Sequence, residues 1–117
     1  MSFILGNRTA ETPEHSLIKH IIASILERNG HKVHLEVECP DGSIVDVFAE
    51  DKDNDGFGVV YEVQTKKQEE IEKEKLKKYK NFAMVRDIIF IRTKEFDMSK
   101  IINSEAYKKL KYKLLGD

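Results

Sequence analysis

Two stretches with a strand pattern each carry an acid where an apolar side chain is expected. Residues 43–50 read SIVDVFAE and residues 58–66 read GVVYEVQTK, and a loop rich in Asp and Gly joins them. Asp46 lies between two valines, and Glu62 lies between Tyr61 and Val63. Burying a carboxylate costs several kcal/mol unless a cation or hydrogen bonds compensate, and aspartate is a poor strand former. Because the acids fall on adjacent strands, we expect them to meet and hold a metal ion.

A helix is predicted ahead of these strands. Thr12 is suited to the N-cap and Pro13 to the first helical position, and Asn29-Gly30 is a typical helix end. Glu14 lies seven residues before Ile21 and eleven before Ile25, so we expect it to face the sheet with the apolar stripe. The stripe consists of Leu17, Ile18, Ile21, Ile22, Ile25 and Leu26.

The remaining pattern predicts three strands, a helix, a strand and a final helix. Alternation begins at residue 32 with Val33, Leu35 and Val37, and the next strands cover residues 43–50 and 58–65, after connections at 40–42 and 51–56. Short turns predict an antiparallel meander. A charged helix at 67–82 then crosses to a strand at 87–92 parallel to the third, and residues 98–115 form the last helix. We therefore expect one α/β domain over residues 1–117, with the order α-β-β-β-α-β-α and a mixed sheet flanked by helices.

Composition narrows the functional classes only slightly. Lys and Arg total 20 against 21 acids, so net charge gives no pointer to nucleic acid, although lysines gather at residues 66–80 and 108–113. Cys39 is the only cysteine, so no internal disulfide is possible and an oxidising compartment is not indicated. No stretch approaches the roughly 20 apolar residues that span a bilayer. We expect a soluble, cytoplasmic protein without a membrane segment.

In this element order, the acids resemble the site of the PD-(D/E)XK nuclease superfamily. That family places an Asp on the second strand, Glu-x-Lys on the third and, in many members, a Glu on the first helix; Asp46, Glu62 and Glu14 match these positions. The resemblance covers residues 14–92 and implies a restriction endonuclease-like fold with a Mg²⁺ or Mn²⁺ site held by the three acids, often with help from the carbonyl of Val63. Mg²⁺ favours such oxygen ligands.

The resemblance also implies an activity: metal-dependent hydrolysis of DNA phosphodiester bonds that leaves 5′-phosphate ends. By size and layout the chain is similar to small archaeal or viral Holliday-junction resolvases, which favours branched DNA as the substrate. We expect DNA as a partner, contacted by Lys66, Lys67, Lys75, Lys78 and Tyr79, with salt-sensitive binding to phosphates. We also expect a homodimer, since cleavage of two strands needs two sites; the apolar stripe at 98–115 forms either the dimer interface or part of the core.

The main departure from the family is Gln64, which occupies the position of the motif lysine. Glutamine cannot supply a positive charge, but it can orient a water molecule. Lys66 lies on the same strand face two residues later and is predicted to supply the ammonium, so Gln64 and Lys66 join Asp46 and Glu62 as candidate catalytic residues. The alternative is a catalytically inactive DNA-binding or assembly protein on the same fold.

A rival interpretation concerns the loop between the strands. Asp51 to Gly56 followed by Glu62 satisfies the EF-hand pattern, which would make the chain a calcium-binding hairpin module. An EF-hand needs a helix on each side, whereas the flanks here have strand composition, so we expect a solvated hairpin loop. The four histidines suit surface positions, although His15, next to Glu14, could approach the acidic site.

Overall fold

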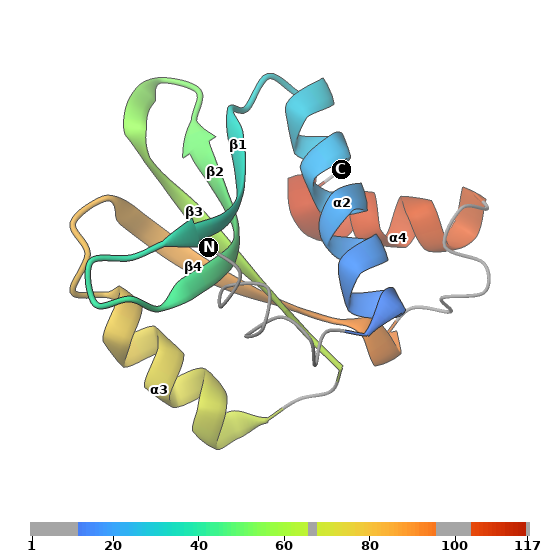
Figure 1. The fold of residues 1–117 in the computed structure, drawn as a ribbon. Coiled ribbons are helices and arrows are strands. Elements are labelled where there is room, and N and C mark those ends of the chain that lie inside the picture. The colour runs from blue at the N-terminus through green and yellow to red at the C-terminus, as the bar shows by residue number, and fades with distance from the viewer. Residues whose placement is uncertain (1–11, 66–67, 96–103, 117) are drawn as a thin grey trace.

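The computed structural model describes residues 12–65, 68–95 and 104–116, with the side chains of residues 104–106 excepted. The elements follow the predicted order, with one short 3₁₀ helix added (Figure 1). They are α2 (Pro13–Arg28), β1 (Val33–Glu38), β2 (Ile44–Asp51), β3 (Asn54–Gln64), α3 (Glu69–Tyr79), β4 (Val85–Arg92), η1 (Thr93–Glu95) and α4 (Ser104–Leu115).

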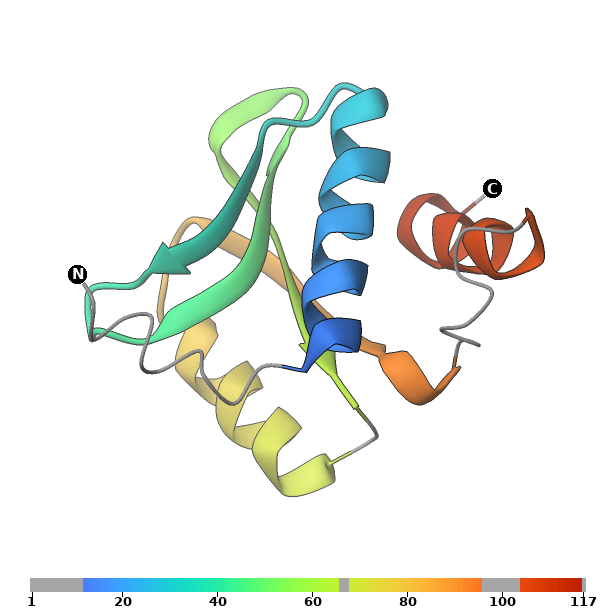
Figure 2. The same cartoon turned by 45° about the vertical axis from the view of Figure 1, so that its right-hand side comes forward.

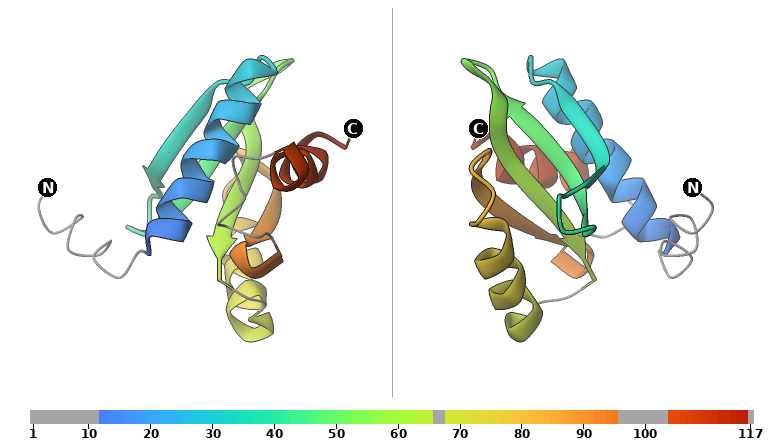
Figure 3. Two further views of the ribbon diagram at one scale, coloured as in Figure 1. Left: turned by 90° about the vertical axis from the view of Figure 1, so that its right-hand side faces the viewer. Right: turned by 60° about the vertical axis from the view of Figure 1, so that its left-hand side comes forward.

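The four strands form one mixed sheet in the order β1-β2-β3-β4. β1, β2 and β3 pair antiparallel as a meander, and α3 crosses over so that β4 pairs parallel with β3. Helices α2 and α4 lie on one face of the sheet and α3 lies on the other (Figures 2 and 3). These observations confirm the α/β class, the antiparallel meander and the parallel fourth strand.

Helix α2 begins and ends where the sequence predicts. The Thr12 side-chain oxygen accepts the His15 N–H at 3.1 Å, Pro13 opens the helix, and Asn29 is its C-cap. Gly30 then adopts a φ of +92°, which glycine tolerates without a steric penalty. The stripe of Ile18, Ile22, Ile25 and Leu26 is at most 1% exposed and packs on the sheet.

Two residues of α2 depart from the simple helical stripe. Leu17, which the spacing placed in the core, is 42% exposed, whereas Lys19 is 1% exposed. The Lys19 ammonium donates to Glu36 on β1 at 2.8 Å, and Glu36 adopts a φ of +54°, which is uncommon for a residue other than glycine. The alternation predicted for β1 breaks at this residue, and Leu35 is 37% exposed.

The described side chains of helix α4 complete the core on the α2 side of the sheet. Leu110 is fully buried and belongs to the cluster that contains the α2 stripe, and Tyr107, Leu114 and Leu115 pack against that cluster. Of the two roles left open for the final apolar stripe, core packing is therefore the one seen here. The first six residues of the predicted helix, 98–103, lie outside the described residues.

The acidic run between β2 and β3 is a tight hairpin rather than a six-residue loop. β3 begins at Asn54, four residues earlier than predicted, and Asp51 pairs with Asn54 across the turn. The Asp51 carboxylate is engaged by Arg86, whose Nη2 lies 2.9 Å from Oδ1. With strands on both sides and its first acid held in an ion pair, this run does not have the helix–loop–helix form of an EF-hand.

Gly58 occupies a position in β3 where the strands approach very closely. A Cβ atom added there would lie 2.0 Å from the Ala49 carbonyl oxygen. We expect Gly58→Ala to lower the free energy of unfolding by about 3 kcal/mol, because backbone must shift to relieve the overlap, as measured by urea denaturation. The control is Gly56→Asn, at φ +87° with no atom within 4 Å of an added Cβ; asparagine tolerates this conformation, so a loss below about 1 kcal/mol is expected. Equal losses in the two variants would contradict this account.

Candidate functional site

The sheet opens between β2 and β3 at the two predicted acids. Backbone pairing of these strands ends at Val47 and Tyr61. Beyond that point the Asp46 N–H donates to Glu62 Oε2 at 2.8 Å, and the Val63 N–H donates to Asp46 Oδ2 at 2.8 Å. The two carboxylates therefore accept backbone N–H groups that would otherwise lie buried without a partner. Asp46 and Glu62 do lie against each other, as the sequence predicts.

Two basic side chains reach this opening from helices on opposite faces of the sheet. From α3, the Lys75 ammonium donates to Glu62 Oε1 at 2.7 Å. From α2, His15 Nε2 lies 2.9 Å from the Val63 carbonyl oxygen and 3.3 Å from Asp46 Oδ2. The same His15 nitrogen thus lies against both the Asp46 carboxylate and the Val63 carbonyl, so these two oxygens face one shared position.

The acids are held in an environment that disfavours their charge. Glu62 is 2% exposed and Asp46 is 4% exposed. Burial raises the pKa of the Glu62 carboxyl, the negative charge of Asp46 raises it further, and Lys75 offsets only part of this effect. A buried carboxyl group with a like-charged neighbour and a raised pKa is a candidate for a functional site.

A second polar network lies beside the acids, between β3, α3 and β4. Gln64 Nε2 donates to Glu72 Oε2 at 2.9 Å, and Arg92 Nη2 donates to both Glu72 oxygens at 2.8 and 3.0 Å. Burial alone would raise the pKa of Glu72, but the hydrogen bonds from Arg92, the Gln68 N–H and Gln64 outweigh it and lower the pKa. Gln64 is 7% exposed, and its buried Oε1 has no hydrogen-bond partner among the described residues.

The first turn of α2 differs from expectation. Glu14 is exposed there, so the buried stripe does not include it, and its neighbour His15 is the residue that contacts Asp46. The surface position predicted for His15 is therefore wrong. The signal was available in the sequence, because His15 lies three residues before Ile18 and seven before Ile22, on the same face of the helix.

The residues predicted to contact DNA have different surroundings. Lys66 and Lys67 lie outside the described residues, and Lys75 is engaged with Glu62. Lys78 is exposed, with its ammonium 3.6 Å from Asp41 Oδ2. Tyr79 is 2% exposed and packs in the core under α3. Its burial corrects the prediction of a DNA contact, because the ring is not available to a ligand on the surface.

The oxygen atoms at the opening can be compared with the ligands that a divalent metal ion requires. Within residues 12–65, 68–95 and 104–116, no group of three or more His, Cys, Asp or Glu side chains is arranged to hold a metal ion. However, Mg²⁺ is commonly bound by one or two carboxylates, with waters and substrate phosphates filling the other positions. Asp46, Glu62 and the Val63 carbonyl offer only hard oxygen donors at the opening, and this chemistry fits Mg²⁺ or Mn²⁺.

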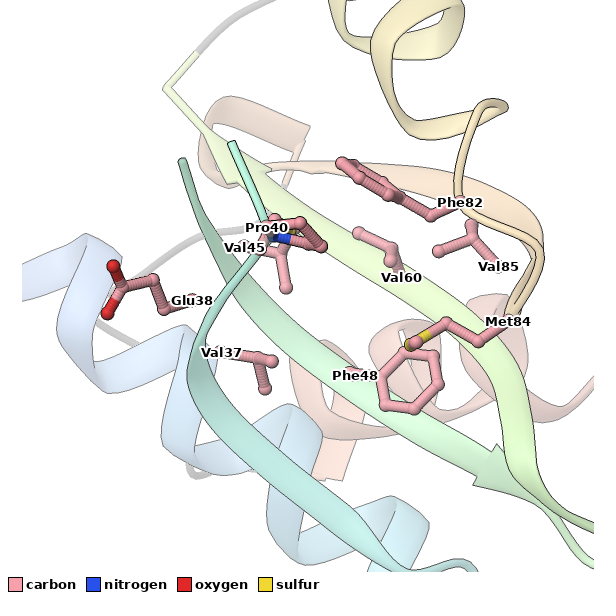
Figure 4. A pocket seen from close by; sticks show the side chains of 10 residues that line it. Val37, Glu38, Pro40, Val45, Phe48, Val60, Phe82, Met84 and Val85 are labelled. Carbon is pink, nitrogen blue, oxygen red and sulfur yellow. The ribbon is translucent and has the colours of Figure 1, made fainter. Parts of the chain in front are cut away.

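An apolar pocket of about 520 Å³ lies on the α3 side of the sheet, close to the acids along the chain (Figure 4). Val45 at its wall precedes Asp46, and Val60 is two residues before Glu62. Phe48, Phe82 and Met84 also line it, with Val37, Pro40 and Val85, and the Glu38 carboxylate points away from them. Cys39 lines the pocket as well; burial raises the pKa of its thiol, and the charge of Glu62 raises it further.

Neither the protein-family models nor the curated proteins include a match to this chain. Within the described part of the chain, none of the helices is long and apolar enough to cross a membrane.

Proposed function

We propose that this chain is a metal-dependent DNA endonuclease with a restriction endonuclease-like fold. The observation that carries the proposal is the pairing of Asp46 and Glu62 at an opening of the sheet, where each carboxylate accepts a backbone N–H from the other strand. Three further features support it: the order of elements, the raised pKa of Glu62, and the hard oxygen donors offered by Asp46, Glu62 and the Val63 carbonyl. The proposed substrate is branched DNA of the Holliday-junction type.

In the proposed enzyme, Asp46, Glu62 and the Val63 carbonyl hold Mg²⁺ or Mn²⁺. His15, in the first turn of α2, contacts Asp46 and the Val63 carbonyl and would orient these oxygens, and Glu14 beside it in the chain stays the proposed third acid. A bound divalent ion lowers the pKa of a water molecule and offsets negative charge on the leaving oxygen. The buried position of the acids keeps their charges in an environment where electrostatic interactions are stronger than in water.

The proposed DNA contacts come from three lysines of the cluster at residues 66–80. Lys78 is exposed at the end of helix α3, and Lys66 and Lys67 precede that helix in the chain. Such lysines bind phosphates without reading sequence, so binding should weaken strongly as salt rises. We propose that the enzyme is a cytoplasmic homodimer, because cleaving both strands of a junction requires two sites.

A catalytically inactive DNA-binding protein is the second candidate. Two observations favour it: Gln64 replaces the motif lysine, and the Asp46 and Glu62 carboxylates already have hydrogen-bond partners without a metal ion. In that case the acids would serve to close the sheet where the backbone pairing of β2 and β3 ends.

Cleavage assays distinguish the two candidates. Supercoiled plasmid and a synthetic four-way junction are incubated with the wild-type protein in Mg²⁺, in Mn²⁺ and in EDTA, and binding is measured in parallel across a salt series. Cleavage in metal but not in EDTA supports the nuclease. Salt-sensitive binding without cleavage favours the inactive DNA-binding protein, and absence of both overturns both candidates.

A further inference from the structure

Two parallel hydrogen bonds link α3 to the strand that carries the acids. Lys75 reaches Glu62, and three residues earlier on the same helix Glu72 accepts from Gln64. Glu62 and Gln64 lie on one face of β3, about 7 Å apart between Cα atoms as next-but-one residues of a strand. Helix α3 therefore supplies a partner to each of the two positions of the Glu-x-Gln motif.

The orientation of the Gln64 amide follows from its partner. Arg92 holds Glu72 as a carboxylate through two hydrogen bonds, and a carboxylate only accepts. Gln64 must therefore turn its NH₂ group toward Glu72, which leaves Oε1 on the opposite side of the amide. That oxygen is buried and has no partner among the described residues. An unpaired buried acceptor is costly, so this oxygen is suited to accept a hydrogen bond from a water molecule in the site.

Lys75 provides the positive charge that glutamine cannot. Its ammonium lies 2.7 Å from Glu62 Oε1, and its side chain is 31% exposed, so the group can reach both the site and the solvent. Lys66, the substitute that the sequence suggests, lies outside the described residues. Among the described residues, Lys75 therefore contacts the proposed metal ligand Glu62. It reaches Glu62 from helix α3, whereas the motif lysine would lie on strand β3.

We infer that the two tasks of the missing lysine are divided between these residues: Lys75 supplies the positive charge beside Glu62, and Gln64 Oε1 orients the attacking water. This inference rests on the proposed nuclease function. In the reaction, the water oxygen bonds to phosphorus as the bond to the 3′ oxygen breaks. The leaving oxygen keeps the electron pair and takes a proton from solvent, and the water releases its proton to solvent. Gln64 orients the water without becoming protonated.

The test combines cleavage of the four-way junction with Mn²⁺ binding by calorimetry, the latter without DNA. We expect Lys75→Met to slow cleavage about 100-fold, as for the loss of one charge-stabilising donor, but to increase Mn²⁺ affinity, because the ammonium no longer competes for Glu62. Gln64→Met should slow cleavage about tenfold with Mn²⁺ affinity unchanged, since only an orienting hydrogen bond is lost. The double variant Gln64→Lys with Lys75→Met restores a lysine at the strand position and should recover at least part of the cleavage.

The control is Lys111→Met, which removes an exposed lysine from α4 on the other face of the sheet and should leave Mn²⁺ affinity and cleavage unchanged. Wild-type rates in Lys75→Met or Gln64→Met would overturn the inference while leaving the nuclease function intact. Parallel losses of cleavage and Mn²⁺ affinity in Lys75→Met would also overturn it, because they indicate a structural role. Failure of the double variant to recover would refute the division of tasks. If the wild-type protein does not cleave in metal, the proposed function itself fails and this inference fails with it.

Discussion

Replacing Asp46 by asparagine is expected to slow metal-dependent DNA cleavage about 1,000-fold. A metal ion contributes several kcal/mol of charge stabilisation in the transition state, and each 1.36 kcal/mol corresponds to a tenfold change in rate. Asparagine removes the charge that holds the ion but keeps an oxygen that can accept the Val63 N–H, which Asp46 Oδ2 accepts at 2.8 Å. The fold should therefore survive, and cleavage of the four-way junction in Mg²⁺ measures the loss.

Two comparisons make this result interpretable. Asp46→Ala removes the acceptor as well and leaves a buried N–H unpaired, so it should lose about 1–3 kcal/mol of stability that Asp46→Asn keeps. Asp53→Ala removes an exposed acid from the hairpin turn and should cleave at the wild-type rate. Should Asp46→Asn cleave within a factor of three of the wild type while the wild type needs metal, the site assignment is wrong.

Replacing Glu62 by glutamine is expected to remove both a pH dependence of stability and a stabilisation by metal. The native pKa of Glu62 is raised by burial and by Asp46 above its ordinary value of 4.5. The native state therefore binds more protons than the unfolded chain between pH 4.5 and the native pKa. Stability must fall as pH rises through that window, and the loss stays in place above it. Glutamine carries no titrating proton, so this fall should be absent in the variant.

A metal ion should reverse this loss in the wild type, because it binds the native state and offsets the repulsion between the two acids. At a free Mg²⁺ concentration of 100 times the dissociation constant, the expected stabilisation is about 2.7 kcal/mol. Urea denaturation from pH 5 to 8, with and without Mg²⁺, measures both effects as the difference between wild type and Glu62→Gln. Identical pH slopes in the two proteins would show that the pKa of Glu62 is not raised. Equal stabilisation of both proteins by Mg²⁺ would show that Glu62 does not hold the ion.

Asp46 and Glu62 are expected to affect both the stability of the fold and the proposed activity. Asp46 and Glu62 are each at most 4% exposed, and neither adds to the apolar core. Lys75, His15 and two backbone N–H groups compensate their charges in part. Backbone pairing there would close the sheet without burying two carboxylates, and the proposed metal site gives a reason for this arrangement.

The elements of this chain could be predicted because their signals are local. Thr12 and Pro13 begin α2, Asn29 and Gly30 end it, and alternating valines define β2 and β3. Boundaries were less accurate where long-range pairing decides them. β3 extends back to Asn54 because its pairing with β2 continues to the turn, and no local preference of Asn, Asp or Gly indicates a strand there.

The candidate site was predicted only in part. Its two acids were visible as polar residues inside apolar strands, and the helical spacing of His15 was a signal for one of their partners, but no local pattern indicated that Lys75 is the other. His15 and Lys75 come from helices on opposite faces of the sheet, and Glu72 reaches Gln64 only because α3 lies across β3 and β4. Tyr79 shows the reverse error: it was expected to contact DNA, whereas packing against the sheet buries the residue.

The sequence by itself determined the order of the elements and placed Asp46 and Glu62 on neighbouring strands, because periodicity and helix caps act over a few residues. The tertiary structure decided that backbone pairing ends beside these acids, that His15 and Lys75 approach them, and that Gln64 turns its NH₂ group toward Glu72. Those outcomes depend on where two helices cross the sheet and where its strands separate. Both are set by contacts between segments far apart in the chain, which no local pattern records.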